Sequence, residues 1–192
     1  MTRSPDPVLH LLAGPNGSGK TTLASRVLVP ATGLAFVNAD DIAARRWRGA
    51  ELEHAYDASE AAAAERQRRF KRRSSFITET VFSHPSKVEL VRAAQESGYL
   101  VSLHVVVIPE ELAVSRVSHR VRLGGHDVPE VKIRERYRRL WPLVAQAREL
   151  ADVTYIYDNS TAREPFRLLA TYELGRLLGN PGWPAWTPTE LR

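Results

Sequence analysis

Short apolar runs, rich in β-branched residues, alternate along the chain with longer segments that have the spacing of helices. Strands are predicted at 8–13, 34–38, 75–78, 99–108 and 153–157. Helices are predicted at 20–29, 53–73, 86–97, 110–123, 129–150 and 162–178. Strands that are apolar at nearly every position are typical of parallel sheets covered by helices on both faces. The pattern therefore predicts an α/β fold with a parallel sheet of about five strands.

The last segment, residues 179–192, has a different composition. Prolines and tryptophans are concentrated there: Pro181, Trp183, Pro184, Trp186 and Pro188. We expect an irregular tail that is held on the domain by its tryptophans. The chain of 192 residues has the length of one domain, so a single domain over 1–192 is expected.

The composition argues against several classes of protein. The chain contains no cysteine, which excludes disulfides and thiolate metal sites. No stretch approaches the roughly 18 consecutive apolar residues that a membrane span needs. The first residues are polar and include Pro5 and Pro7, unlike a signal peptide. A cytoplasmic protein with no membrane association is therefore expected.

The chain is basic, with a formal net charge of +5 and a pI of about 9.8. Much of the positive charge falls into two runs, at 66–73 and 116–139. Such charge favours partners that carry phosphate groups, either nucleic acid or a nucleotide substrate. The first run also fits the solvated end of a helix. Basic charge alone therefore leaves nucleic acid open as a partner.

A phosphate-binding loop follows the first predicted strand. The sequence GPNGSGKT fits the pattern G-x-x-x-x-G-K-[ST] between a strand and a helix. Glycines let backbone N–H groups turn towards a phosphate, and the following helix adds the positive end of its dipole. In this motif Lys20 reaches the β- and γ-phosphates, and the Thr21 hydroxyl ligates Mg²⁺. ATP and Mg²⁺ are the expected cofactors, bound by Gly14, Pro15, Asn16, Gly17, Ser18, Gly19, Lys20, Thr21 and Thr22.

Acidic side chains follow the second and third predicted strands, at the end of the sheet where α/β proteins bind ligands. Of Asp40 and Asp41, we expect one to accept a proton from an attacking hydroxyl and the other to cap the next helix. An acid at the position of Glu79 can bind the water shell of a metal or the hydroxyls of a substrate. Thr80 and Ser83 can line the same crevice.

Two arginine-bearing helices around a Gly-Gly turn predict a lid over residues 110–140. Arg116 and Arg120 are four residues apart, so they share one helix face. A lid can close over a triphosphate and bring guanidinium groups to the transferred phosphoryl group. The alternatives are a surface pair of helices and a nucleic-acid patch. His126, in the turn, is interpreted as a residue that caps a helix or hydrogen-bonds locally, with a role as a base as the alternative.

Together these motifs resemble the zeta toxin family, within the kinase group of P-loop folds. The matching features are GPNGSGKT at 14–21, Asn-Ala-Asp at 38–40, Glu-Thr at 79–80, Arg-Val-x-x-Gly-Gly-His at 120–126 and Tyr-Asp-Asn-Ser at 157–160. The resemblance implies an ATP-dependent kinase. In the best known members the acceptor is UDP-N-acetylglucosamine, phosphorylated on the 3′-hydroxyl of its sugar.

The resemblance also implies roles for individual residues. Asp40 corresponds to the catalytic aspartate of the family and Glu79 to the acid of its third strand. Arg120 and Arg136 correspond to arginines that stabilise phosphate, with Arg134 as a substitute. The expected catalytic residues are Asp40, Lys20, Arg120 and Arg136. The expected substrate-binding residues are Asp40, Glu79, Thr80, Ser83 and Arg134.

One departure from the family leaves the acceptor open. The toxins carry a threonine that contacts the sugar two places after the strand-three acid, and this chain has Val81 there. The leading hypothesis is a small-molecule kinase, with UDP-N-acetylglucosamine as the first acceptor to test. The alternatives are a kinase acting on a nucleic-acid 5′-hydroxyl or another metabolite, and a non-catalytic module that binds ATP. Neither toxicity nor an antitoxin partner follows from the sequence.

Overall fold

The computed structural model of the chain describes residues 5–123 and 128–192, and its centre is a mostly parallel sheet. The strands are β1 (Val8–Ala13), β2 (Ala35–Val37), β3 (Phe76–Thr80), β4 (Leu100–Val107), β5 (Val153–Asp158), β6 (Arg167–Glu173) and β7 (Arg176–Leu178). They lie in the order β2-β3-β1-β4-β5-β6-β7. The first five are parallel, whereas β6 and β7 are antiparallel to their neighbours. The predicted α/β fold is confirmed, but over the described residues the sheet has seven strands instead of about five.

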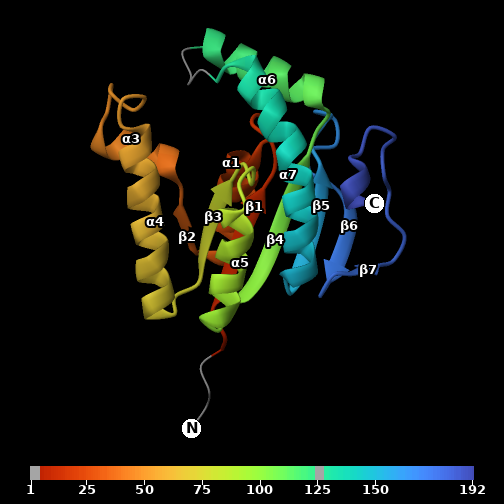
Figure 1. Ribbon diagram of the computed structural model, residues 1–192, viewed down its shortest axis with the longest axis horizontal. Coiled ribbons are helices and arrows are strands. Elements are labelled where there is room, and N and C mark those ends of the chain that lie inside the picture. Colours follow the sequence, from red (N-terminus) through yellow and green to blue (C-terminus); the bar gives the residue numbers. More distant parts are fainter. Residues whose placement is uncertain (1–4, 124–127) are drawn as a thin grey trace.

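Helices connect the parallel strands and cover the sheet (Figure 1). They are α1 (Lys20–Leu23), the π-helical turn η1 (Ala24–Leu28), α2 (Val29–Thr32), α3 (Ala39–Arg46), α4 (Ala55–Arg72), α5 (Ser86–Glu96), α6 (Glu110–Arg122), α7 (Glu130–Leu150) and the 3₁₀ turn η2 (Thr189–Leu191). α5 and α7 pack on each other and on β4, whereas α1 and η1 pack on the opposite face. α6 lies beyond the carboxyl ends of the strands and packs against α7 (Figure 1).

The core is divided between the two faces of the sheet. Leu11 and Leu103 belong to a large group of buried side chains under α5 and α7. Leu12 and Val106 belong to a smaller group that also includes Leu23 of α1. Neighbouring residues of a strand point to opposite faces, so each strand must be apolar on both sides. This division explains why apolar residues follow one another directly at 11–13 of β1 and at 105–107 of β4 instead of alternating with polar ones.

The predicted helix at 162–178 is wrong, because this segment forms the hairpin of β6 and β7. Leu174 and Gly175 make its two-residue turn, with φ of 47° and 74°. Positive φ at both central residues is the backbone of a type I′ turn, which matches the twist of the flanking strands. Pairing of β6 with β5 also buries Tyr172. Local helical spacing was therefore overridden by a tight turn and by pairing with the preceding strand.

The segment after β7 is largely irregular and packs on the domain. Trp183 and Trp186 are partly buried against the larger core. The sequence did not single out Leu191, which is fully buried in η2 and whose carbonyl accepts a hydrogen bond of 3.1 Å from Tyr172. The predicted Gly-Gly turn and His126 lie outside the described residues.

Candidate functional site

The loop of residues 14–19 turns tightly between β1 and α1. At Gly14, where φ is +149°, a Cβ would collide with the backbone oxygen of Val106. At Gly19, where φ is +96°, a Cβ would lie 2.5 Å from Asn159 Nδ2. Only glycine fits these two positions. Lys20 Nζ donates hydrogen bonds of 2.9 and 3.0 Å to the carbonyls of Gly14 and Pro15, so a buried cation is fixed against the loop.

A crevice of about 630 Å³ opens over this loop, at the carboxyl ends of β1, β2 and β3. Of the residues expected to bind ATP or acceptor, its lining includes Asn16, Gly17, Gly19, Lys20, Thr21, Thr22, Asp40, Glu79, Thr80, Arg120 and Arg136. Gly14, Pro15 and Ser18 are buried behind them. The volume lies in the range of ordinary ligand pockets. The structure therefore gathers most of the expected site residues around one space that fits a nucleotide.

The electrostatics of Lys20 suit an anionic ligand. Burial lowers the pKa of Lys20, whereas the negative charges of Glu79 and Asp40 act to raise it. The positive charge of Arg120 adds to the lowering, which places this arginine within electrostatic range of the lysine. Charges act more strongly on each other where water is scarce. A phosphate bound here would relieve the repulsion between the two cations.

Thr21 and Glu79 form the candidate Mg²⁺ position. Thr21 Oγ1 donates to Glu79 Oε1 at 2.8 Å and lies 3.1 Å from Oε2. Within residues 5–123 and 128–192, no group of three or more histidine, cysteine or acidic side chains is arranged to hold a metal ion. In kinases Mg²⁺ is commonly held by one or two protein oxygens together with phosphates and water. The Thr21–Glu79 pair fits this mode, in which the metal arrives with the nucleotide.

Asn38, rather than an aspartate, caps α3. Its Oδ1 accepts a hydrogen bond of 2.7 Å from the backbone N–H of Asp40, and its Nδ2 donates to Glu79 Oε1 at 3.0 Å. The expectation that Asp40 or Asp41 caps this helix is therefore wrong, since both lie in its first turn. Asp40 lines the crevice, whereas Asp41 lines a separate groove. Of the two adjacent acids, only Asp40 is placed to act on a ligand in the crevice.

Glu79 is the most buried acid of the crevice. It and Thr80 are the last residues of β3, which extends two residues beyond its predicted end. Burial raises the pKa of Glu79, while the charge of Lys20 and the hydrogen bond from Thr21 oppose the shift. The nearby charges of Asp40 and Asp41 raise it further. Glu79 therefore has a higher proton affinity than an exposed glutamate, unless a cation is added beside it.

Three arginines line the crevice from the two helices of the predicted lid. Arg116 and Arg120 come from α6 and Arg136 comes from α7. Arg116 also donates to the backbone carbonyls of Gly17 at 3.4 Å and Asn159 at 2.9 Å. These contacts attach α6 to the phosphate loop. The arrangement can stabilise negative charge above Lys20.

Two expected substrate-binding residues are not brought into the crevice. Arg134 is only two positions from Arg136, but its guanidinium bonds Glu111 at 2.8 Å and Glu130 at 2.8 Å. Ser83 lies beyond the end of β3 and is absent from the lining of the crevice. Since Arg134 already pairs with carboxylates, it serves to join α6 and α7 rather than to bind an anion.

Asn159 is a site residue whose role the sequence did not reveal. Its backbone N–H donates to Val107 O at 3.1 Å, and its Nδ2 donates to Ser18 O at 2.8 Å. It thus connects the end of β5 to the phosphate loop. Its position directly after a predicted strand, within the Tyr-Asp-Asn-Ser segment, was the one feature of the sequence that could have indicated this role.

A second cavity of about 250 Å³ adjoins the crevice. Asp40 and Arg120 line both spaces. Ala39 also lines both spaces, and the other walls of the second cavity come from the small side chains of Ala43, Ala55 and Ala58 and from the carboxylate of Glu51. One space can therefore hold the triphosphate and the other an acceptor, with Asp40 at their boundary.

Comparison with family models gives a match over residues 1–165 to the family described as "Zeta toxin". No curated protein sequence matches the chain significantly. None of the described helices has the length and apolar character needed to cross a membrane.

Solved structures share the fold. A chain of the AvrRxo1-ORF1:AvrRxo1-ORF2 complex with sulphate ions has a TM-score of 0.70 and 16% identity, over 91% of this chain and 61% of that chain. The same complex has also been solved with ATP. A chain of the PezAT chromosomal toxin–antitoxin system of Streptococcus pneumoniae has a TM-score of 0.62 and 14% identity, over 80% of this chain and 69% of that one.

A gluconokinase from Sinorhizobium meliloti has a TM-score of 0.51 and 17% identity, over 80% of this chain and 83% of its own. This chain spans less than two thirds of the AvrRxo1-ORF1:AvrRxo1-ORF2 chain it matches. At such identities the likeness concerns the fold, which is that of the P-loop kinases.

Proposed function

Because the chain belongs to the zeta toxin family, we propose that it is an ATP-dependent kinase that transfers the γ-phosphoryl group to a hydroxyl of a small molecule. One observation carries this proposal. A single crevice joins the phosphate loop, the carboxylate of Asp40 and the arginines of α6 and α7, and it adjoins a second cavity suited to an acceptor. Phosphoryl transfer is catalysed mainly by such positioning and charge stabilisation.

Asp40 is the proposed general base. It lies on the boundary between the two cavities, where an acceptor hydroxyl would face the γ-phosphate. Asp40 accepts the hydroxyl proton while the acceptor oxygen forms its bond to the γ-phosphorus. The bond from that phosphorus to the bridging oxygen breaks, and ADP leaves. The amide of Asn38 fixes the start of the helix that carries this carboxylate.

Lys20, Arg120 and Arg136 are proposed to stabilise the phosphoryl group as charge shifts during transfer. They approach the crevice from α1, α6 and α7 respectively. Thr21 and Glu79 would hold Mg²⁺, which supplies additional positive charge at the β- and γ-phosphates when bound. Arg116 acts differently, because its guanidinium is bonded to backbone carbonyls and so orients the loop.

UDP-N-acetylglucosamine is the proposed acceptor, and membership of the family supports it. The alanine walls of the second cavity leave room for a bulky, uncharged group such as a sugar. Val81 lines the crevice at the position where the toxins carry a sugar-contacting threonine. A valine cannot donate the hydroxyl hydrogen bond of a threonine. We therefore expect weaker discrimination between sugar nucleotides than a threonine would provide.

The test is transfer of label from γ-labelled ATP with Mg²⁺ to a panel of UDP-sugars. We expect label on UDP-N-acetylglucosamine with the native chain and none with Lys20→Ala. Asp40→Asn should bind ATP as before and transfer about 10²–10⁴-fold more slowly. An unchanged rate of phosphoryl transfer in Asp40→Asn would show that Asp40 is not the base. ATP binding without transfer to any UDP-sugar would reject the acceptor and leave the nucleotide site intact.

A nucleic-acid 5′-hydroxyl is the second candidate acceptor. The net charge of +5 and the run of arginines on α4 favour it. Label transfer to a 5′-hydroxyl oligonucleotide, with affinity that falls steeply as salt rises, is the expected sign of this activity. Absence of oligonucleotide binding at low salt would exclude it.

A further inference from the structure

The sheet has an open edge at β2. This strand pairs with β3 on one side, and in the part of the chain that the structure describes no strand pairs with its other side. An edge strand presents backbone N–H and C=O groups to which another extended segment can bond. β2 is three residues long, which limits such pairing to a short segment.

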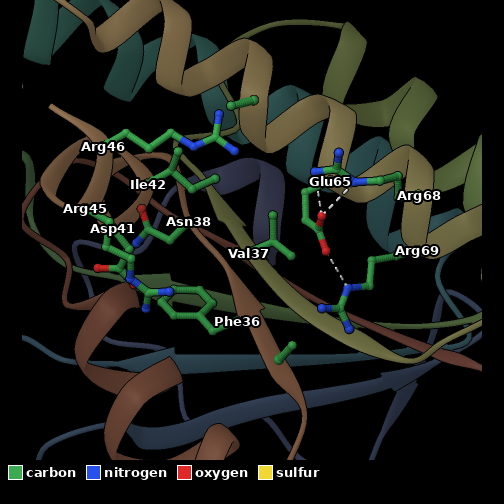
Figure 2. A pocket seen from close by; sticks show the side chains of 12 residues that line it. Phe36, Val37, Asn38, Asp41, Ile42, Arg45, Arg46, Glu65, Arg68 and Arg69 are labelled. Atoms are coloured by element: carbon green, nitrogen blue, oxygen red, sulfur yellow. Dashed lines mark hydrogen bonds and ion pairs between the residues drawn. The ribbon is translucent and has the colours of Figure 1, made fainter.

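A groove of about 310 Å³ runs along this edge (Figure 2). Its base is formed by consecutive residues of β2 and its exit, 35–38. Phe36 packs towards the smaller core on one face of the sheet, and Val37 belongs to the larger core on the other face. The groove therefore straddles the sheet edge instead of lying on one face. A strand placed along it would send alternate side chains towards the two faces.

Arginines stand on both sides of the groove. Arg45 and Arg46 come from the last turn of α3, and Arg68 and Arg69 come from α4 (Figure 2). Glu65 accepts hydrogen bonds of 2.9 Å from each of the two α4 arginines. These bonds lower the pKa of Glu65 and keep it ionised. A guanidinium has five N–H donors, so one carboxylate leaves donors on both arginines for a further acceptor.

The balance of charge in the groove is positive. Four arginines face two carboxylates, Glu65 and Asp41. Arg45 and Arg46 are exposed, so their guanidinium groups can reach a ligand without unfolding the helix. A ligand that fits this groove combines backbone hydrogen-bonding groups, small apolar side chains and carboxylates.

We propose that this groove binds an extended acidic segment of a partner protein, which adds as a strand to the free edge of β2. Backbone hydrogen bonds to β2 would supply the pairing, and carboxylates of the segment would pair with arginines that line the groove. A single small anion would use the arginines and leave the backbone edge unused. A nucleic acid would bring its phosphates against Glu65 and Asp41 as well. The groove lies outside the crevice and shares only Asn38 with it, so this proposal is independent of the kinase proposal.

The probe is a fluorescein-labelled hexapeptide that alternates valine and glutamate, followed by fluorescence anisotropy with the purified chain. We expect saturable binding that weakens at least tenfold in the double variant Arg45→Glu, Arg46→Glu. The matched control is Arg92→Glu, Arg139→Glu, which reverses two exposed arginines outside the described grooves and should bind like the native chain. Equal binding by both double variants would overturn the proposal. Thermal melts check that each variant is folded.

A second measurement separates strand addition from charge attraction. Two versions of the peptide carry N-methyl groups at odd or at even positions, which removes alternate backbone donors while keeping every carboxylate. At least one version should bind tenfold or more weakly, because one set of donors faces β2. Undiminished binding by both versions would show attraction by charge alone and reject strand addition. A labelled oligonucleotide of twelve deoxythymidines tests the nucleic-acid alternative. Arginine-dependent binding of this oligonucleotide, without binding of the peptide, would identify a nucleic-acid surface and reject strand addition.

Discussion

Asn38 Nδ2 donates a hydrogen bond of 3.0 Å to Glu79 Oε1, and this bond ties together the carboxyl ends of two adjacent parallel strands. The oxygen of the same amide, Oδ1, caps α3 by accepting a hydrogen bond from the backbone N–H of Asp40. One side chain therefore fixes both the helix that carries the proposed base and the acid of the proposed metal position.

The two functions of Asn38 can be separated by substitution. Asn38→Asp keeps an oxygen acceptor for the cap, but it cannot donate to Glu79 and adds a like charge beside it. Asn38→Ala loses both bonds and should lower the free energy of unfolding by about 1–2 kcal/mol. We expect Asn38→Asp to be the more stable of the two in urea unfolding, while both weaken Mg²⁺-dependent ATP binding in calorimetry. Native-like ATP binding by Asn38→Asp would show that the bond to Glu79 is dispensable.

The fold was predictable where local pattern and tertiary structure agree. β1, β4 and β5 are short runs of mostly apolar or aromatic residues, and the glycines of the phosphate loop follow β1 directly, so their positions were readable from the sequence. The hairpin of β6 and β7 could not be predicted in this way, because the spacing of apolar residues in this segment also fits a helix. Its identity depends on a two-residue turn at Leu174 and Gly175 and on the pairing of β6 with β5, contacts that helical spacing within the segment does not report.

In the candidate site, too, the sequence predicted less than the structure shows. Asp40 and Asp41 are neighbours in sequence, but successive residues of a helix point about 100° apart. Asp40 therefore enters the crevice and Asp41 the groove at β2. The side chains of Arg134 and Arg136 point in different directions for the same reason. Carboxylates of α6 and α7 bind Arg134. The residue types were predictable, whereas the direction of each side chain required the helix phase and its neighbours.

Asn159 and Arg116 should act together on the phosphate loop. Asn159 bonds the carbonyl of Ser18, and Arg116 bonds the carbonyls of Asn159 and Gly17. Asn159→Ala removes the bond to Ser18, so the loop loses part of its orientation before ATP binds. One hydrogen bond contributes about 1 kcal/mol, which corresponds to about a fivefold loss of ATP affinity in calorimetry.

The control for Asn159→Ala is Thr161→Ala, a truncation at an exposed position just beyond it. Thr161→Ala should bind ATP like the native chain. Equal affinities for the two variants would show that the side chain of Asn159 does not orient the loop.

Glu79 should make the stability of the protein depend on pH. Its pKa is raised in the folded state, so the folded chain holds a proton more tightly than the unfolded chain. The contribution is fully favourable below the ordinary pKa of 4.5 and is lost as the pH rises through the folded value. At neutral pH the ionised, buried carboxylate therefore reduces stability.

The variant Glu79→Gln removes this titration and keeps an oxygen that can accept from Thr21 or Asn38. We expect it to melt at a higher temperature than the native chain at pH 7, and we expect the difference to shrink as the pH falls to 4. Melting curves from pH 4 to 8 without Mg²⁺ make the measurement. A difference that is constant across this range would mean that the effect of the substitution comes from packing rather than from ionisation.

Leu174 should be a weak point of the C-terminal hairpin. Its φ is 47° and its side chain is 69% exposed, so it adopts a left-handed backbone without the compensation of burial. This conformation is unfavourable by about 1–2 kcal/mol for most L-residues, whereas asparagine adopts it readily and Asn-Gly is a preferred type I′ turn. Leu174→Asn should therefore raise the free energy of unfolding in urea by about 1 kcal/mol. Leu177→Asn, at another exposed leucine on β7, has no such strain to relieve and should give no increase. If Leu174→Asn unfolds at the same urea concentration as the native chain or at a lower one, the hairpin is not limited by this turn.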